Sequence, residues 1–194
     1  MVMEREIELR LVARLKAGDS AAFEIVYDTF RPRLFSFLAR LCRRGDVAED
    51  LLEETWLRLV ACARDLTDDT RLAAWLFTVA RNLHVSWRRH RALDWERISE
   101  LTPSWLGPAA AGETPFEAAA RTETERRLET ALARLSLPDR EVLLLVTVEG
   151  ITPSEAASLL GLAPEALRKR LQRARERLAL EMGASSASSR AKVG

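Results

Sequence analysis

Apolar residues recur at a helical spacing along most of this chain, and no segment alternates as a strand would. In the first 91 residues they fall three and four positions apart, which places them on one face of an α-helix. Such patterns predict helices over about 7–15, 23–30, 34–41 and 47–60. A longer helix is predicted from Leu72 to about Arg91, and no hairpin signal occurs. The sequence therefore predicts an all-α fold.

Two glycine–aspartate pairs and one polar segment separate these helices. Gly18 can end a helix and Asp19 can cap the next one. Gly45 and Asp46 repeat the arrangement, with Asp46 as the expected N-cap. The segment 65–71 (DLTDDTR) is polar and poor in helix formers, so we predict a loop there. The helices between these breaks are expected to form a first domain over 1–91.

The composition changes between residues 92 and 121. Three prolines, two glycines and an alanine run occur there, which favours a flexible linker with little regular structure. A second helical domain is predicted over 122–182. Residues 183–194 (GASSASSRAKVG) are small and polar, and we expect a disordered tail there. The predicted fold class is thus all-α, with two small helical domains joined by a flexible linker.

The strongest local signal is a helix-turn-helix in the second domain. Residues 152–155 (TPSE) form a capping box with proline at the first helical position. The short helix that follows should end at Gly161, and a last helix should begin near Pro164 after a tight turn. Two capped helices at this spacing are typical of a helix-turn-helix.

The last of these helices combines an apolar face with a basic one. Its apolar residues fall at positions i, i+4, i+7 and i+11 and are Leu167, Leu171, Ala174 and Leu178. Between Pro164 and Leu178 there are six basic and two acidic residues, a local net charge of +4. Such a helix suits a major groove, with its first side chains near base edges and later arginines on phosphates. The alternative is a helical hairpin whose basic face is only solvated.

A second basic cluster occupies residues 81–91 (RNLHVSWRRHR). It holds four arginines, both histidines of the chain and Trp87, with no acidic residue. Arginines beside an aromatic ring suit a single nucleic-acid strand, because a base can stack on the ring while phosphates meet the cations. A helix end with Trp87 in the core is the alternative, and the sequence does not decide between them.

Acidic residues gather in the segment 48–59 (AEDLLEETWLRL). Glu49, Asp50, Glu53 and Glu54 lie in the early turns of a predicted helix, where negative charge also favours the helix dipole. The cluster fits a partner-binding surface, but stabilisation of the helix explains it without any partner.

The remaining composition argues against several classes of function. Cys42 and Cys62 lie in apolar helical patterns away from both histidines, so no metal site is expected. Without a glycine-rich phosphate loop or a nucleophile elbow, we expect no enzyme, no cofactor and no small-molecule substrate. The charged N-terminus is unlike a signal peptide, and no apolar run approaches the ~20 residues that span a bilayer. These features predict a cytoplasmic protein with no direct membrane insertion.

Taken in order, these segments resemble the extracytoplasmic-function (ECF) sigma factors, group IV of the sigma-70 family, over nearly all of residues 8–181. AEDLLEETWLRL is similar to the polymerase-binding helix of sigma region 2, and LAAWLFTVARNLHVSWRRHR to its promoter-melting helix. The segment 135–178 is similar to region 4, the helix-turn-helix that recognises the −35 element. The resemblance implies a bacterial initiation factor that binds core RNA polymerase and directs it to promoter DNA.

The resemblance also implies roles for individual residues. Those facing the clamp coiled coil of the β′ subunit would be Asp50, Leu51, Glu53, Glu54 and Trp56. The loop capturing a flipped −10 base would hold Asp68, Asp69, Thr70 and Arg71, and the adjoining strand would meet Asn82, Ser86, Arg88 and Arg89. The −35 element would meet Arg168, Lys169, Gln172 and Arg173, with Arg175 and Arg177 on phosphates. The family further implies contact with the β flap and an anti-sigma factor as a partner.

Two other classes of protein fit parts of the sequence. A helix-turn-helix regulator with an N-terminal sensor would bind duplex DNA by itself, usually as a dimer on a palindrome. An all-α adaptor would use its basic faces to bind acidic proteins. A sigma factor, by contrast, would bind duplex DNA weakly until polymerase is present.

Overall fold

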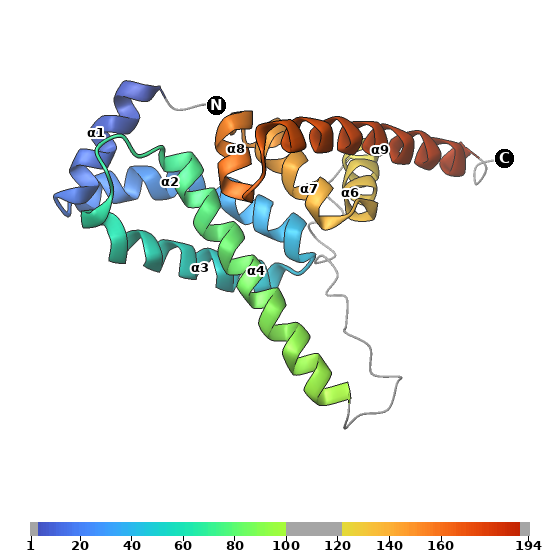
Figure 1. Cartoon of the computed structure of the whole chain (residues 1–194), viewed down its shortest axis with the longest axis horizontal. Coiled ribbons are helices and arrows are strands. Elements are labelled where there is room, and N and C mark those ends of the chain that lie inside the picture. Colours follow the sequence, from blue (N-terminus) through green and yellow to red (C-terminus); the bar gives the residue numbers. More distant parts are fainter. Residues whose placement is uncertain (1–3, 100–121, 191–194) are drawn as a thin grey trace. The chain divides into compact units, whose positions relative to one another are not determined.

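The computed structural model describes residues 4–99 and 122–190, and the regular structure in these ranges is entirely helical (Figure 1). The chain divides into two compact units, with the division at Gly112 and Glu113. The elements of the first are α1 (Arg5–Lys16), α2 (Ser20–Cys42), α3 (Gly45–Cys62), the 3-10 turn η1 (Ala63–Asp65) and α4 (Leu72–Ser99). The elements of the second are α6 (Glu123–Arg134), α7 (Leu137–Leu143), the π-helical turn η2 (Leu144–Val148), α8 (Pro153–Leu160) and α9 (Pro164–Arg190). The predicted all-α class with two helical domains is confirmed.

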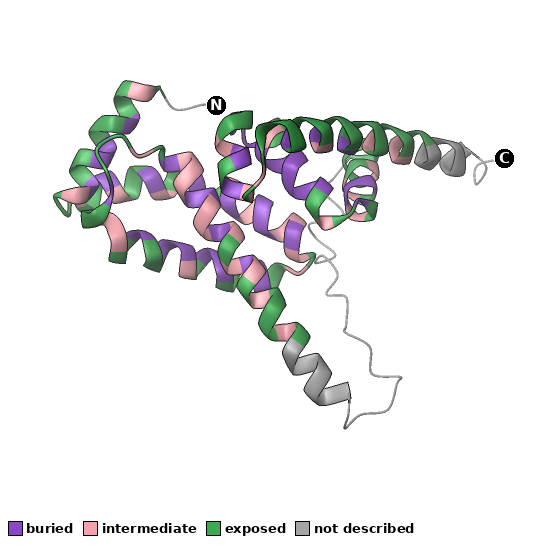
Figure 2. Ribbon diagram, in the orientation of Figure 1, coloured by how far each residue is buried: buried purple, intermediate pink, exposed green. Residues whose placement is uncertain are grey.

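The first unit is a bundle in which α2, α3 and α4 pack against one another, while α1 packs on α2 and η1. Phe37 of α2 and Phe77 of α4 meet edge to face with ring centroids 5.1 Å apart, and both are fully buried. Buried residues of α2 and α3 turn toward this core, as Figure 2 shows. The bundle leaves one side of α3, the loop before α4 and one side of α4 open to solvent.

Helix α2 is continuous over both helices predicted at 23–30 and 34–41. The prediction of a break between them was therefore wrong. Pro32 lies inside α2, where an interior proline costs about 3 kcal/mol. Against this cost, one continuous face of the helix buries Phe30, Leu34 and Phe37, and each such side chain contributes roughly 1.5–3 kcal/mol. Core burial therefore outweighs the proline.

The two predicted glycine–aspartate breaks have different outcomes. Gly18 adopts φ +78°, and the Asp19 side chain accepts hydrogen bonds from the amides of Ala21 and Ala22, as predicted. The prediction of Asp46 as an N-cap is wrong, because α3 already begins at Gly45 and Asp46 lies in its first turn. There Asp46 forms an ion pair with Arg44, which occupies the cap position in an extended conformation.

Both long helices extend past their predicted ends. Helix α4 continues to Ser99, so residues 92–99 are helical instead of belonging to the predicted linker. Helix α9 continues to Arg190, which contradicts a disordered tail over 183–190. Adding residues to an existing helix costs far less than starting one, and no proline interrupts either extension. The rest of the predicted linker, 100–121, and the last four residues lie outside the described ranges.

The second unit is held together by a buried arginine at the start of α7. Arg140 is 5% exposed, and its Nε donates to the carbonyl oxygen of Leu132 at 2.8 Å. Its Nη2 donates to the carbonyl oxygens of Ala133 at 2.8 Å and Leu135 at 3.0 Å. These carbonyls lie at the C-terminal end of α6, where a helix runs out of amide donors of its own, and the Leu132 oxygen also accepts the Leu135 amide at 3.2 Å. The neighbouring Asp139 forms an ion pair with Arg177 of α9, so one dipeptide ties α7 to both flanking helices.

Among the helices of residues 4–99 and 122–190 there is no candidate for a membrane-spanning segment.

Candidate polymerase and nucleic-acid interfaces

The first candidate surface is the solvent-facing side of α3. Asp50 and Glu53 are exposed, and Glu54 is half-buried with its Oε1 accepting a hydrogen bond from Arg58 Nε at 2.9 Å. At 100° per residue these three carboxylates fall within about 100° of one another around the helix axis. Three of the four predicted acidic residues therefore share one outward side, while Glu49 is exposed about 140° from Glu54 around the axis.

Two exposed apolar residues extend this surface and were missed by the sequence reasoning. Leu57 is 64% exposed and Val60 is 61% exposed. Leu57 lies four positions after Glu53 and three after Glu54, so it shares their side of the helix. The apolar pattern over 47–60 predicts burial for Val60, and this is wrong. We refer to Asp50, Glu53, Glu54, Leu57 and Val60 as the α3 face.

The assignment of Leu51 and Trp56 to direct polymerase contact needs correction. Leu51 is 8% exposed and Trp56 is 7% exposed. The Trp56 ring lies 4.9 Å from Tyr27 and 6.0 Å from Phe23 of α2, measured between ring centroids. Both residues pack α3 against the bundle, so they orient the α3 face and do not form part of it.

The second candidate surface begins at the loop between η1 and α4. Residues 66–71 form this loop, in agreement with the prediction for 65–71 except that Asp65 closes η1. Asp68 and Asp69 are exposed and Thr70 is half-buried with its hydroxyl 3.0 Å from that of Thr67. A hydrogen bond from Thr67, with smaller contributions from the Asp69 amide and the charge of Arg5, lowers the pKa of Asp69. The Asp69 carboxylate, which is ionised at neutral pH at its ordinary pKa, therefore also stays ionised further into the acidic range.

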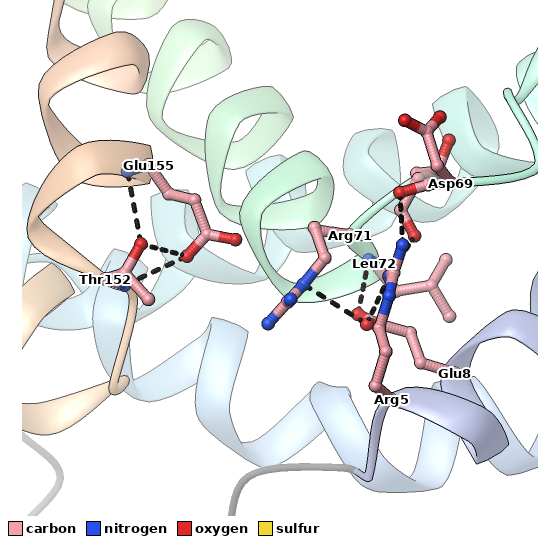
Figure 3. Close-up of polar contacts among 8 residues, drawn as sticks. Arg5, Glu8, Asp69, Arg71, Leu72, Thr152 and Glu155 are labelled. Carbon is pink, nitrogen blue, oxygen red and sulfur yellow. Dashed lines mark hydrogen bonds and ion pairs between the residues drawn. The ribbon is translucent and has the colours of Figure 1, made fainter.

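Helix α1 contacts the end of the loop 66–71 through Glu8, as the close-up in Figure 3 shows. The Glu8 carboxylate is 5% exposed, and its Oε1 accepts the Leu72 amide at 2.8 Å. Its Oε2 lies 2.8 Å from Arg5 Nη1 and 3.3 Å from Arg71 Nε. Arg5 also donates to the carbonyl oxygens of Asp69 at 2.7 Å and Thr70 at 3.2 Å. Neither Arg5 nor Glu8 was predicted as a site residue.

The surface continues along the outer side of α4. Asn82, Ser86, Arg88 and Arg89 are all exposed. Asn82, Ser86 and Arg89 fall within about 60° of one another around the axis, whereas Arg88 lies about 120° from Asn82. The four predicted residues are thus divided between one shared face and one flank. Figure 1 shows the C-terminal half of α4 extending beyond α2 and α3.

The aromatic part of the 81–91 cluster is only partly available to a partner. Trp87 is half-buried. Its ring centroid lies 6.2 Å from that of the buried His84 ring and 5.4 Å from the guanidinium carbon of Arg91. A cation over an indole ring forms a favourable cation–π contact. The sequence left two roles open for Trp87, a core residue at a helix end or a ring on which a base stacks. The structure fits neither fully, because the ring is partly buried and partly covered by Arg91.

The third candidate surface is the helix-turn-helix of the second unit. Helix α8 opens with the predicted capping box, in which Thr152 Oγ1 accepts the Glu155 amide at 3.3 Å and Glu155 Oε2 accepts the Thr152 amide at 3.0 Å (Figure 3). Gly161 ends α8 in the left-handed region at φ +64°. Helix α9 begins at Pro164 and packs on α8. The predicted capping and turn are confirmed.

The predicted division of α9 into two faces is confirmed as well. Leu167, Leu171 and Ala174 are buried and Leu178 is half-buried. The candidate −35 residues Arg168, Lys169, Gln172 and Arg173 are exposed, and so is Arg175. Arg168 pairs with Glu165 and Gln172 donates to Glu176, both at 3.0 Å on the helix surface. Exposed pairs of this kind are weak, so they leave the side chains available to a ligand.

Arg177 differs from the other predicted phosphate-binding residue, Arg175. Its guanidinium pairs with Asp139, whose side chain is only 8% exposed, across from α7. Removing one partner of such a pair leaves a poorly solvated charge behind. The side chain of Arg177 is itself 56% exposed, so its assignment to phosphate stays a prediction, and its pair with Asp139 also fastens α9 to α7.

No group of three or more metal-ligating side chains was found among the residues that the structure describes. Burial raises the pKa of the Cys42 thiol to about 12, so Cys42 stays protonated at neutral pH and is a poor metal ligand.

An all-α chain with a capped helix-turn-helix and an outward basic helix belongs to the helix-turn-helix class of DNA-binding proteins. Models of sigma-70 region 2 and of sigma-70 region 4 match residues 26–93 and 125–178 of this chain. The chain belongs to the sigma-70 family, within which it is an ECF RNA polymerase sigma factor.

Individual relatives agree with this assignment. The chain is 35% identical to RNA polymerase sigma factor CarQ of Myxococcus xanthus, over 85% of this chain and 91% of CarQ. It is 34% identical to ECF RNA polymerase sigma factor EcfG of Rhodopseudomonas palustris, over 76% of this chain and 77% of EcfG. Among solved structures it is similar to the sigma factor RpoE of Bartonella quintana in complex with the anti-sigma factor NepR. That match has a TM-score of 0.66 and 27% identity and covers 83% of this chain and 96% of RpoE.

Proposed function

We propose that this sigma factor uses three separate surfaces during initiation. The α3 face binds the clamp coiled coil of the polymerase β′ subunit. The loop 66–71 and the outer side of α4 capture and hold the −10 strand. The first three turns of α9 contact the −35 bases. The observation that supports this division best is the outward basic surface of α9, opposite its buried apolar stripe.

The test of the whole proposal is transcription from a pool of random DNA templates by core polymerase with and without this chain. The selected templates should share two short sequence elements separated by a fixed spacing. Templates that share no element, or an element bound by the chain equally well without polymerase, would contradict the proposal. The second result would favour a helix-turn-helix regulator.

The partners and compartment follow from the same proposal. Core polymerase and promoter DNA lie in the bacterial cytoplasm, so we place the chain there. The polymerase supplies the chemistry of RNA synthesis, and we infer that this chain is not itself an enzyme. RpoE was solved with the anti-sigma factor NepR, which supports an anti-sigma factor as a further partner of this chain. Contact of the second unit with the β flap is part of the same proposal.

The α3 face combines the two components of a specific protein interface. Charged residues around a contact mainly steer association, while buried apolar side chains near its centre supply most of the affinity. In the α3 face the carboxylates of Glu53 and Glu54 flank the exposed Leu57. A basic partner surface with an apolar centre would complement this arrangement.

Reversing the charge of Glu54 should weaken polymerase binding. We expect Glu54→Arg to raise the dissociation constant roughly tenfold, about 1.4 kcal/mol, because a cation would face a basic coiled coil. The effect should shrink as salt rises, since the contact is electrostatic. Titration of core polymerase with labelled chain at several salt concentrations measures this.

Two further variants make the result specific. Glu6→Arg changes an exposed carboxylate on α1, away from the α3 face, and should bind normally. Leu57→Ala should weaken binding to a similar degree at every salt concentration, because it removes apolar contact area. Undiminished binding by both Glu54→Arg and Leu57→Ala would contradict the assignment of the α3 face.

The two adjacent arginines of α4 should differ in their effect on promoter opening. Arg89 shares a face with Asn82 and Ser86, whereas Arg88 lies on the flank. We expect Arg89→Ala to reduce permanganate reactivity of unpaired −10 thymines several-fold, because one phosphate of the strand would no longer meet a cation. Arg88→Ala removes the same charge from a neighbouring position and should have the smaller effect. Equal effects would mean that the cluster acts only through its total charge.

A further inference from the structure

We propose that Arg5 and Glu8 of α1 are positioning residues for −10 base recognition. This inference rests on the proposed function of the loop 66–71. Helix α1 contributes none of the residues assigned to DNA or polymerase, yet it makes a set of polar contacts with the loop and with the first residue of α4.

Glu8 caps the start of α4 from a distant part of the chain. A helix leaves its first amides without partners, and a residue just before the helix usually supplies an acceptor. Here the acceptor for the Leu72 amide is Glu8, 64 positions earlier in the chain. The carboxylate is buried, so it would be costly without the nearby charges of Arg5 and Arg71. Glu8 thus fixes the point at which the loop ends and α4 begins.

Arg5 fixes the middle of the same loop. One guanidinium joins the Glu8 carboxylate to two successive loop carbonyls, those of Asp69 and Thr70. The planar guanidinium presents its donors in a rigid fork, so it restrains the direction of both peptide groups. At the other end of α1, Lys16 pairs with Asp68. Three consecutive loop residues are therefore held from one helix.

This arrangement bears on recognition because the loop itself has no regular structure. A loop that must order itself on binding loses part of its interaction free energy to that ordering. A pocket for one flipped base also discriminates between bases only if its polar groups are held in place. Removing the hydrogen bonds from α1 should therefore reduce the preference for the correct base more than it reduces overall DNA affinity.

The experiment measures holoenzyme binding to single-stranded −10 oligonucleotides, taken from a selected promoter, that differ only at the captured base. The variants are Arg5→Ala and Glu8→Gln. The second keeps an oxygen that can accept the Leu72 amide but removes the charge that pairs with Arg5 and Arg71 and so holds Arg5 on the loop. The matched controls are Arg10→Ala and Glu6→Gln, which remove an exposed ion pair from the same helix. We expect the ratio of affinities for the preferred and other bases to fall roughly tenfold in the variants, and to stay unchanged in the controls.

Two accompanying measurements separate positioning from general damage. Binding to core polymerase and to −35 duplex should be unchanged in Arg5→Ala and Glu8→Gln, because the α3 face and α9 are not touched. A variant with three alanines at 68–70 tests the loop itself. If that variant keeps the base preference, the proposed role of the loop fails. If it loses the preference while Arg5→Ala and Glu8→Gln keep it, the loop assignment stands and the role of α1 is wrong.

Discussion

Replacing Arg140 with alanine should destabilise the second unit by about 3 kcal/mol, because it removes three hydrogen bonds donated by a buried cation. The carbonyl oxygens of Leu132, Ala133 and Leu135 would each lose the arginine as a donor, while the Leu132 oxygen would keep the Leu135 amide. Hydrogen bonds that involve a charged group contribute roughly 1.5–3 kcal/mol each, and partial hydration of the carbonyls would recover some of this free energy. The consequence for function is that the helix-turn-helix would lose its support from α6.

Hydrogen exchange monitored by mass spectrometry measures this in the intact chain. Peptides from α6 to α9 should exchange faster in Arg140→Ala, while peptides from α2 and α3 serve as an internal reference. Arg134→Ala is the matched control, since Arg134 makes an exposed ion pair with Glu181 worth less than about 1 kcal/mol. Equal protection in the two variants would show that Arg140 is not the main link between α6 and α7.

The parts of the fold that follow local rules could be predicted from the sequence. The caps at Asp19 and Thr152 and the helix end at Gly161 depend on residues within three or four positions, and each is confirmed. The caps that Glu8 and Arg140 provide have no such signature, because Glu8 acts on an amide 64 positions away and Arg140 acts on the end of another helix. Chain folding, and not local sequence, brings these partners together.

The candidate sites show a similar limit. Over 164–178, helical spacing predicts which residues of α9 face inward, because the apolar stripe there is narrow and nearly all other residues are polar; further on, the apolar Leu180 is 73% exposed. In α3 the apolar residues cover more of the circumference, so spacing alone does not separate buried Trp56 from exposed Leu57. In α1 the expected core position Ile7 is 47% exposed and the carboxylate of Glu8 takes its place. A charged residue on a buried stripe was the signal that could have revealed this contact.

Substitutions on α9 should fall into three groups according to where each side chain lies. Lys169 and Arg173 are exposed within the first three turns, in the N-terminal part of α9 where a recognition helix meets base edges. Lys169→Ala and Arg173→Ala should therefore change the preferred −35 bases. Each bidentate hydrogen-bonded contact to a base that is removed should cost about 1–3 kcal/mol of binding discrimination. Arg175 lies on the flank of the helix, so Arg175→Ala should weaken binding to all templates nearly equally. It should also reduce the slope of the logarithm of the binding constant against the logarithm of salt concentration by about one.

Arg177 forms the third group, because it already pairs with a buried carboxylate of α7. Arg177→Ala leaves Asp139 without its cation, so it should speed hydrogen exchange in α7 and α9 before it alters any base preference. Binding of holoenzyme to a set of −35 variants at several salt concentrations, together with exchange, distinguishes the three groups. If all four substitutions weaken every template equally and leave exchange unchanged, α9 is an electrostatic anchor, and the −35 bases are recognised by some other part of the protein.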